Sequence, residues 1–172
     1  NTPGQYIFSQ RTNFTDLNND GNLDIFVCHD IAPSCYYLNN GTGALTFYQS
    51  TVTPGAMSIA TTTGNYATLF TDFDNDGDMD IIITASSGAH NFFRNNLDTT
   101  NGTEEAYSNI TAGSGWDTNL STNTDNIAYD FDNDGKVDVI GGGNKIMFNQ
   151  GNNTFAPVTY TGLGVSSVGD LN

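Results

Sequence analysis

Short runs of apolar and β-branched residues recur along the chain, separated by turns rich in glycine, asparagine and threonine. Three of these runs do not alternate with polar residues, and each follows an acidic segment: residues 23–28, 79–84 and 137–140. Short continuous apolar runs bounded by turn signals are typical of strands that are covered on both faces. No stretch has a helical period bounded by caps. The sequence therefore predicts an all-β protein.

Each of these runs belongs to a longer repeated pattern. A second predicted strand ends in a polar pair, a third follows a Gly-, Asn- and Thr-rich turn, and a short strand precedes the acidic segment. The second strands are residues 36–40, 92–96 and 146–150, the third strands are 45–49, 106–110 and 155–160, and the preceding strands include 66–71 and 127–129. This pattern predicts four short antiparallel strands per unit, with the acidic segment as the first hairpin connection.

The acidic segment is a nine-residue motif, D-x-[DN]-x-D-G-x-x-D, which occurs at residues 16–24, 72–80 and 130–138. Oxygen-bearing side chains occupy positions 1, 3, 5 and 9, and apolar residues occupy positions 2 and 8. Clustered carboxylates repel one another unless a cation lies among them, and an all-oxygen ligand set with flexible geometry favours calcium over magnesium. The side chains at positions 1, 3 and 5 can converge on one point only if the backbone reverses direction sharply, and glycine at position 6 permits this turn. Because position 7 varies, we expect it to contribute its backbone carbonyl.

The predicted calcium ligands are therefore the residues at positions 1, 3, 5, 7 and 9 of each motif. They are Asp16, Asn18, Asp20, Asn22 and Asp24; Asp72, Asp74, Asp76, Asp78 and Asp80; and Asp130, Asp132, Asp134, Lys136 and Asp138. We predict about three calcium ions per chain, one for each complete motif.

Other interpretations of the motif are weaker. An EF-hand needs a bidentate acid at position 12, where this chain has Val27, Ile83 and Gly141. A solvated acidic turn without metal does not explain three copies in one register. An array of calcium loops without a core does not explain the apolar runs between the motifs.

The motif starts are 56 and 58 residues apart, and the letters D-L-N at 170–172 open a fourth motif 40 residues after the third. Asp170 and Asn172 thus join the candidate ligands. We predict a single β-repeat region over 1–172, with units near 5–65, 66–124 and 125–165 and a fourth beginning at 166–172. Four strands in roughly 40 to 60 residues is the size of a β-propeller blade.

The acidic loop, its apolar strand and the Y-L-N-N-G hairpin at residues 37–41 resemble the FG-GAP/VCBS repeat family, which forms the calcium-bearing blades of integrin-α-type propellers. The resemblance covers nearly the whole chain. It implies one calcium per blade, held between the first two strands at the positions given above. Family propellers usually have about seven blades, so three blades and a beginning suggest a segment of a larger propeller, or an open array continued by other copies.

Charge narrows the possible partners. Nineteen Asp and Glu residues face four Lys and Arg residues, giving a formal charge of -15, and eleven of the acids occupy positions 1, 3, 5 and 9 of the motifs. A negative field without a basic cluster argues against nucleic acid as a partner. No apolar run approaches the ~20 residues of a membrane span, so membrane insertion is not expected. Calcium loops of this kind lead us to expect an extracellular or cell-surface location.

Cys28 and Cys35 lie on either side of a turn that contains Pro33. In a secreted protein they could form a disulfide across the hairpin. Two buried thiols are the alternative, and the sequence leaves both open.

The sequence offers no catalytic constellation, since the motifs use most of its carboxylates and neither histidine stands in a hydrolase motif. We therefore expect a non-enzymatic, calcium-binding segment of an extracellular structural or adhesive protein, such as a fibre or surface component. Its partners would be other copies of itself, further repeats of the same chain, glycans or extracellular proteins. The alternative is a carbohydrate-binding propeller or a non-catalytic scaffold of a polysaccharide-degrading enzyme, for which Trp116 is the candidate exposed aromatic.

Glycosylation is a further candidate modification. Sequons occur at Asn13, Asn40, Asn101, Asn109, Asn119 and Asn152. Thr99, in the triplet Asp-Thr-Thr, resembles a bacterial O-glycosylation site. Sequons on hairpin turns, such as Asn40-Gly-Thr, offer room for a glycan.

Overall fold

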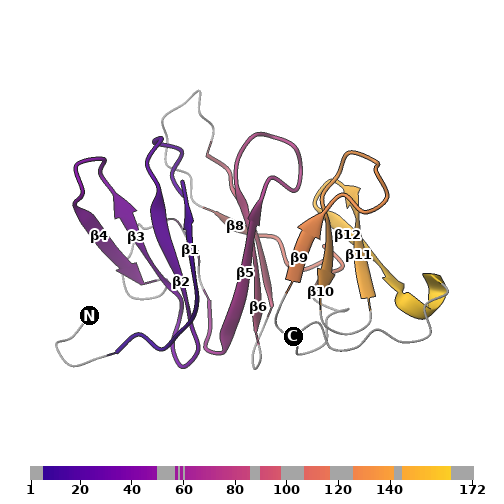
Figure 1. The fold of residues 1–172 in the computed structure, drawn as a ribbon, viewed down its shortest axis with the longest axis horizontal. Helices are drawn as coiled ribbons and strands as arrows, with labels where there is room; N and C mark the ends of the chain where they lie inside the picture. Colours follow the sequence, from indigo (N-terminus) through magenta and orange to yellow (C-terminus); the bar gives the residue numbers. More distant parts are fainter. Residues whose placement is uncertain are drawn as a thin grey trace.

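In a computed structural model, the protein consists of three four-stranded antiparallel sheets that stand side by side along the chain (Figure 1). The structure describes residues 6–49, 57, 59, 61–85, 90–97, 107–116, 126–141 and 145–163. The only helix among them is the 3-10 turn η1 (Tyr160–Leu163). None of the described residues forms a helix long and apolar enough to span a bilayer.

Each sheet follows the chain in simple up-and-down order. The first sheet contains β1 (Ser9–Thr15), β2 (Asp24–His29), β3 (Cys35–Asn39) and β4 (Leu45–Gln49). The second contains β5 (Asn65–Thr71), β6 (Asp80–Ala85), β7 (Asn91–Arg94) and β8 (Ser108–Asn109). The third contains β9 (Asn126–Tyr129), β10 (Asp138–Gly141), β11 (Lys145–Gly151) and β12 (Thr154–Thr159). These are propeller-type blades, and the fold predicted from the sequence is confirmed.

The acidic motif forms the first hairpin connection of every blade, as predicted. The strands on either side close on the pairs Thr15↔Asp24, Thr71↔Asp80 and Tyr129↔Asp138, so the last aspartate of each motif is the first residue of the second strand. The candidate fourth unit, including Asp170 and Asn172, lies outside the described residues.

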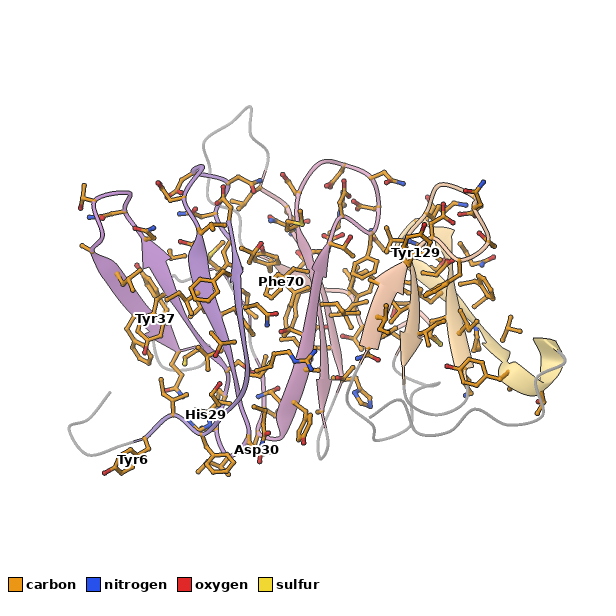
Figure 2. All side chains as sticks on the ribbon, in the orientation of Figure 1. Tyr6, His29, Asp30, Tyr37, Phe70 and Tyr129 are labelled. Atoms are coloured by element: carbon orange, nitrogen blue, oxygen red, sulfur yellow. The ribbon has the colours of Figure 1, made fainter. Side chains whose placement is uncertain are left out.

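Two apolar clusters hold the blades together. The first lies between blades 1 and 2 and includes Phe26 and Tyr36 from the first blade and Ile81 and Ile83 from the second. Figure 2 shows Phe70 of β5 in this layer, where its ring lies 5.5 Å from that of Phe26. The partly buried aromatics thus take part in the contact between blades.

The second cluster lies between blades 2 and 3 and includes Ile82 and Phe92 from the second blade and Val139 and Met147 from the third. Successive residues of β6 therefore contribute to opposite clusters. This explains why the apolar runs do not alternate with polar residues, because both faces of a middle blade are covered.

Trp116 is not an exposed ligand-facing residue, so this prediction is wrong. Its side chain is fully buried in the second cluster, with its ring 5.5 Å from that of Phe155. Gly115 (φ +80) allows the approach, since a Cβ at this position would lie 2.2 Å from the carbonyl oxygen of Phe155. The backbone amide of Phe155 also donates to the carbonyl of Ser114 at 2.7 Å. The glycine-rich segment crosses to the third blade instead of forming a surface loop.

Of the two alternatives that the sequence left open, the structure shows two buried thiols, since Cys28 and Cys35 are both free and buried. The strand register explains this, because Cys35 pairs with Val27, and Cys28 is the next residue along β2. Neighbouring residues of a strand point to opposite faces of the sheet, so the two sulfur atoms cannot meet. Desolvation raises the pKa of each thiol to about 11, which keeps both protonated at neutral pH.

Candidate metal sites

The first aspartate of each motif anchors the loop by accepting two backbone hydrogen bonds. Its carboxylate accepts from the amides at positions 5 and 6 at 3.1 and 2.8 Å for Asp16, 3.0 and 2.9 Å for Asp72, and 3.0 and 2.9 Å for Asp130. The glycine at position 6 has φ between 85 and 99 in the three loops, a conformation that glycine adopts without strain. The asparagine at position 4 is also left-handed, with φ of 55, 60 and 62 for Asn19, Asn75 and Asn133.

The last aspartate of each motif lies at the base of the loop and is fully buried in all three blades. One oxygen accepts from the amide at position 2 at 2.9, 3.0 and 2.9 Å. The other accepts from the backbone amide of an asparagine in the last part of the third strand or just after it, at 2.8 Å in each blade: Asn39, Asn95 and Asn149. The loop is thus tied both to its own entry and to the next hairpin.

The middle of each loop is held in the same way. The side chain at position 5 accepts a hydrogen bond from the amide at position 7 at 2.8, 3.0 and 2.9 Å in the three loops. The bond helps to position residue 7, whose own backbone carbonyl was expected to serve as a ligand.

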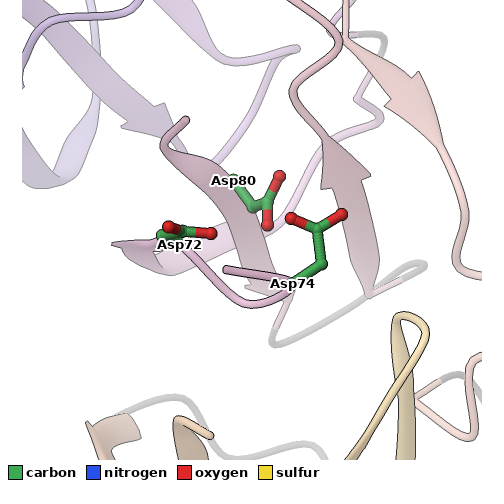
Figure 3. A group of neighbouring side chains, drawn as sticks. All are labelled: Asp72, Asp74 and Asp80. Atoms are coloured by element: carbon green, nitrogen blue, oxygen red, sulfur yellow. The ribbon is translucent and has the colours of Figure 1, made fainter. Parts of the chain in front are cut away.

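The carboxylates converge. In the second loop Asp72, Asp74 and Asp80 each offer an oxygen within 4.8 Å of the others (Figure 3). Asp130, Asp132 and Asp138 do the same in the third loop. In the first loop, an asparagine replaces the aspartate at position 3, so its carboxylate cluster is smaller while the number of candidate oxygen ligands is unchanged.

The residues fit a hard divalent cation. Asp74 Oδ1 is buried and has no hydrogen-bond partner, although it lies among like-charged groups. A buried carboxylate oxygen without a partner is costly, and a cation bound among these carboxylates would satisfy it. The oxygens at positions 1, 3, 5 and 9, with the carbonyl at position 7, would hold the ion.

Burial raises the pKa of the last aspartate of each motif. The pKa of Asp80 is raised from 3.8 to about 7, mainly by desolvation; backbone hydrogen bonds from Asn95 and Phe73 oppose the shift, and the charges of Asp74 and Asp76 add to it. Desolvation also raises the pKa values of Asp24 and Asp138. Proton and cation therefore compete for the same oxygens.

We expect calcium to stabilise the protein more at about pH 8 than at about pH 5. Without metal, folded Asp80 keeps its proton up to about pH 7, whereas the unfolded chain releases it near 3.8. The folded state then binds more protons than the unfolded state, so its stability falls as pH rises through this window. Calcium binds the deprotonated carboxylate, so its affinity for the folded protein rises over the same pH range. Thermal melts with calcium or with chelator across this range test this, and a calcium effect independent of pH would contradict it.

Basic side chains reach two of the loops. Arg94 forms ion pairs with Asp74 Oδ2 at 2.8 Å and with Asp76 Oδ2 at 3.1 Å. Lys136 at position 7 directs its amine to Asp134. The first loop has fewer carboxylates and no ion pair among the described contacts. The charge of the loops is therefore partly balanced within the chain.

The predicted glycosylation sites differ in their surroundings. Asn40 and Asn152 are exposed on turns, and their modification stays a prediction. Asn13 donates its side-chain amide to Thr68 between blades 1 and 2, and Asn109 donates to Asn91, so both amides are already engaged. Asn101, Asn119 and Thr99 lie outside the described residues.

Sequence reasoning missed several residues that shape the loops. The asparagines at positions 39, 95 and 149 were noted only as part of a polar pair. They lie 15, 15 and 11 residues after the last aspartate of their motifs, so the available signal was the recurrence of an asparagine after the apolar part of each of these strands. Arg94 and Tyr107 carry no such signal, because neither residue recurs at the matching place in the other blades.

Comparisons with known proteins agree with this geometry. The sequence profile of the FG-GAP-like repeat matches residues 16–83 and 72–141. No curated protein matches the chain.

The fold is also found among solved structures. One of them is a lectin from Agrocybe aegerita, described as recognising non-reducing terminal N-acetylglucosamine, with 24% identity and a TM-score of 0.51. The match covers 87% of this chain and 37% of the lectin chain, so this chain spans little more than a third of the lectin. The repeated profile covers most of the chain, with each match spanning two successive loops, and the chain belongs to the family of FG-GAP-like repeats.

Proposed function

We propose that this chain is a calcium-binding repeat module of an extracellular structural or adhesive protein, without catalysis of its own. The observation that carries the proposal is the loop itself, which recurs three times with the same backbone hydrogen bonds and brings three carboxylates together in its second and third copies. In the second copy it leaves the buried oxygen of Asp74 without a partner. Calcium would stabilise the first hairpin of each blade by binding to its loop, and the hairpin in turn would stabilise the edge of the blade.

A face of the third blade supports association with a further blade. Ile127 pairs with Ile140 just as Leu69 pairs with Ile82 in the second blade. In the second blade Ile82 is fully buried and Leu69 is half-buried in the contact with the third blade, whereas the equivalent residues of the third blade are more exposed: Ile140 is half-buried and Ile127 is 58% exposed.

Two aromatic residues extend this face. Phe131 occupies the motif position of the buried Leu17 and Phe73 and is 39% exposed. Tyr129, whose ring lies 5.6 Å from that of Phe131, is exposed too (Figure 2). We infer that a blade of the same repeat type covers this face, and that in a preparation of this chain a second copy supplies it.

Light scattering after size-exclusion chromatography tests the proposal. In calcium we expect particles larger than one chain that dissociate when EGTA is added. Ile127→Lys should lower the particle mass in calcium, because it places a charge in the covered face. Ile31→Lys is the matched control, since Ile31 is 69% exposed in the connection after β2 and lies outside this face. A particle mass that depends neither on calcium nor on Ile127 would contradict the assembly.

Carbohydrate binding is the second candidate function. The observation that favours it is the fold shared with the lectin, whose title assigns it a sugar ligand. The burial of Trp116 removes the aromatic residue that was expected to face a sugar. A glycan array probed with the calcium-loaded chain tests this candidate: specific binding to a terminal sugar would support it, and no binding to any glycan would contradict it.

A further inference from the structure

The loops of neighbouring blades are joined by buried hydrogen bonds. Between blades 1 and 2, the hydroxyl of Tyr107 lies 3.2 Å from the carbonyl oxygen of Leu17 and 3.0 Å from that of Met79. It also accepts a hydrogen bond from Asn95 Nδ2 at 3.1 Å. Leu17 is position 2 of the first loop and Met79 is position 8 of the second. One hydroxyl proton therefore serves two loops that belong to different blades.

Between blades 2 and 3 a different residue makes the same connection. Asn149 Nδ2 donates to the carbonyl oxygen of Phe73 at 2.8 Å and to that of Val137 at 3.2 Å. Phe73 is position 2 of the second loop and Val137 is position 8 of the third. Both interfaces thus link the same two motif positions through a single buried donor group.

A second set of contacts joins the loops nearer to solvent. The side chain of Asn19 in the first loop donates to Asp78 in the second, and that of Asn75 in the second donates to the carbonyl of Gly135 in the third at 3.4 Å. Asn19 and Asn75 both occupy position 4. Asn153 of the third blade donates to Asp74 Oδ2 at 3.1 Å. Contacts between neighbouring loops therefore repeat along the array.

These bonds meet the backbone beside the ligand positions. Position 2 lies between the ligands at 1 and 3, and position 8 lies between those at 7 and 9. A loop that is ordered by an ion presents its carbonyl to the shared donor in a fixed place. The donor is then already fixed when it bonds to the carbonyl of the neighbouring loop. Less conformational entropy remains to be lost when an ion orders that second loop.

We propose that the Tyr107 hydroxyl is a positioning group that couples the first and second calcium loops, so that calcium bound in one raises the affinity of the other; Asn149 has the same role between the second and third loops. This inference rests on the proposed calcium binding. Coupling between sites is reciprocal and changes affinities by roughly fivefold to a hundredfold in other proteins.

Tyr107→Phe tests the coupling, because it removes one hydroxyl and keeps the buried ring. Tyr36→Phe is the matched control, since Tyr36 lies in the same apolar cluster and its buried hydroxyl has no hydrogen-bond partner. The readout is a calcium titration of the metal-stripped protein followed by amide NMR. The position-6 glycines, Gly21, Gly77 and Gly135, report the three loops separately.

In the unchanged protein and in Tyr36→Phe, we expect Gly21 and Gly77 to respond together over a narrow calcium range. In Tyr107→Phe their midpoints should separate, with the affinity of at least one loop falling roughly tenfold, while Gly77 and Gly135 stay coupled. Identical titrations of all three glycines in Tyr107→Phe and the unchanged protein would overturn the coupling alone. The absence of any calcium response at the glycines would overturn calcium binding itself.

A second pair of variants answers the case in which Tyr107→Phe does not fold. Asn19→Gly removes the side-chain contact to the second loop, and glycine accepts the φ of 55 at this position. Asn133→Gly is the control, because Asn133 has the same position and a φ of 62, and no loop follows it in the described part of the chain. Coupling predicts that Asn19→Gly weakens the joint response of Gly21 and Gly77 and that Asn133→Gly leaves it unchanged. If Gly21 and Gly77 titrate with the same calcium midpoints in both variants, the contact between Asn19 and Asp78 does not contribute to the coupling.

Discussion

Removal of calcium with EGTA is expected to lower the melting temperature by roughly 20 °C or more. Calcium bound only by the folded state stabilises each site by about 2.7 kcal/mol at a hundredfold excess over its dissociation constant. Three such sites give about 8 kcal/mol, and each kcal/mol corresponds to about 2–4 °C in a domain of this size. Differential scanning calorimetry at fixed pH and ionic strength measures the shift.

The physical reason is the charge of the loops. The second motif places five aspartates within nine residues, and Arg94 is the cation that pairs with two of them. Without an ion the remaining carboxylates repel one another or take up protons. Magnesium added with EGTA is the control, because its demand for regular octahedral geometry suits this loop less well. A melting temperature that is the same in calcium and in EGTA would contradict the stabilising role of calcium.

Phe73→Ala should destabilise the protein by about 3–5 kcal/mol, whereas Phe131→Ala should cost less than about 1 kcal/mol. Both residues are phenylalanine at position 2 of a motif, but Phe73 is 1% exposed and Phe131 is 39% exposed. The ring of Phe73 lies 5.5 Å from that of Phe92 and 5.6 Å from that of Phe155, so its loss leaves a cavity between blades 2 and 3. Phe131 has no described blade beyond it.

Urea unfolding of both variants in calcium measures the difference. The slope against urea should stay unchanged, which would show that the midpoints report stability. Equal losses in the two variants would contradict the assignment of position 2 as the contact between successive blades. At a concentration where copies associate, the cost of Phe131→Ala should rise, because the proposed partner blade covers that ring.

Local patterns in the sequence predicted most of the fold. The acidic loop and the apolar run after it lie next to each other along the chain, so the strand that follows each motif was predicted to within one residue at either end. The prediction for the last strand of the second blade was less accurate: a strand over residues 106–110 was expected, and β8 covers Ser108–Asn109. This strand is short, with only two residues paired to β7, so it contains too few residues to show a clear pattern of apolar and polar positions.

Features that depend on contacts between blades were not predicted. Trp116 stands among glycines, which is typical of a surface turn, yet Gly115 is needed for close approach to the backbone of Phe155. The spacing of Cys28 and Cys35 suggested a bridge across a hairpin, but only the register reveals that they face opposite sides. The hydroxyl of Tyr107 meets a carbonyl ninety residues away along the chain, which no local pattern encodes.

The most direct test of the account is to count the calcium ions on the chain by native mass spectrometry. The metal-stripped protein is titrated with calcium, and variants with alanine at positions 1 and 5 of one loop, such as Asp72→Ala with Asp76→Ala, are compared with it. We predict three ions on each unchanged chain and a lower number when one loop is altered. A chain that acquires no specifically bound calcium at any loop would contradict the central claim.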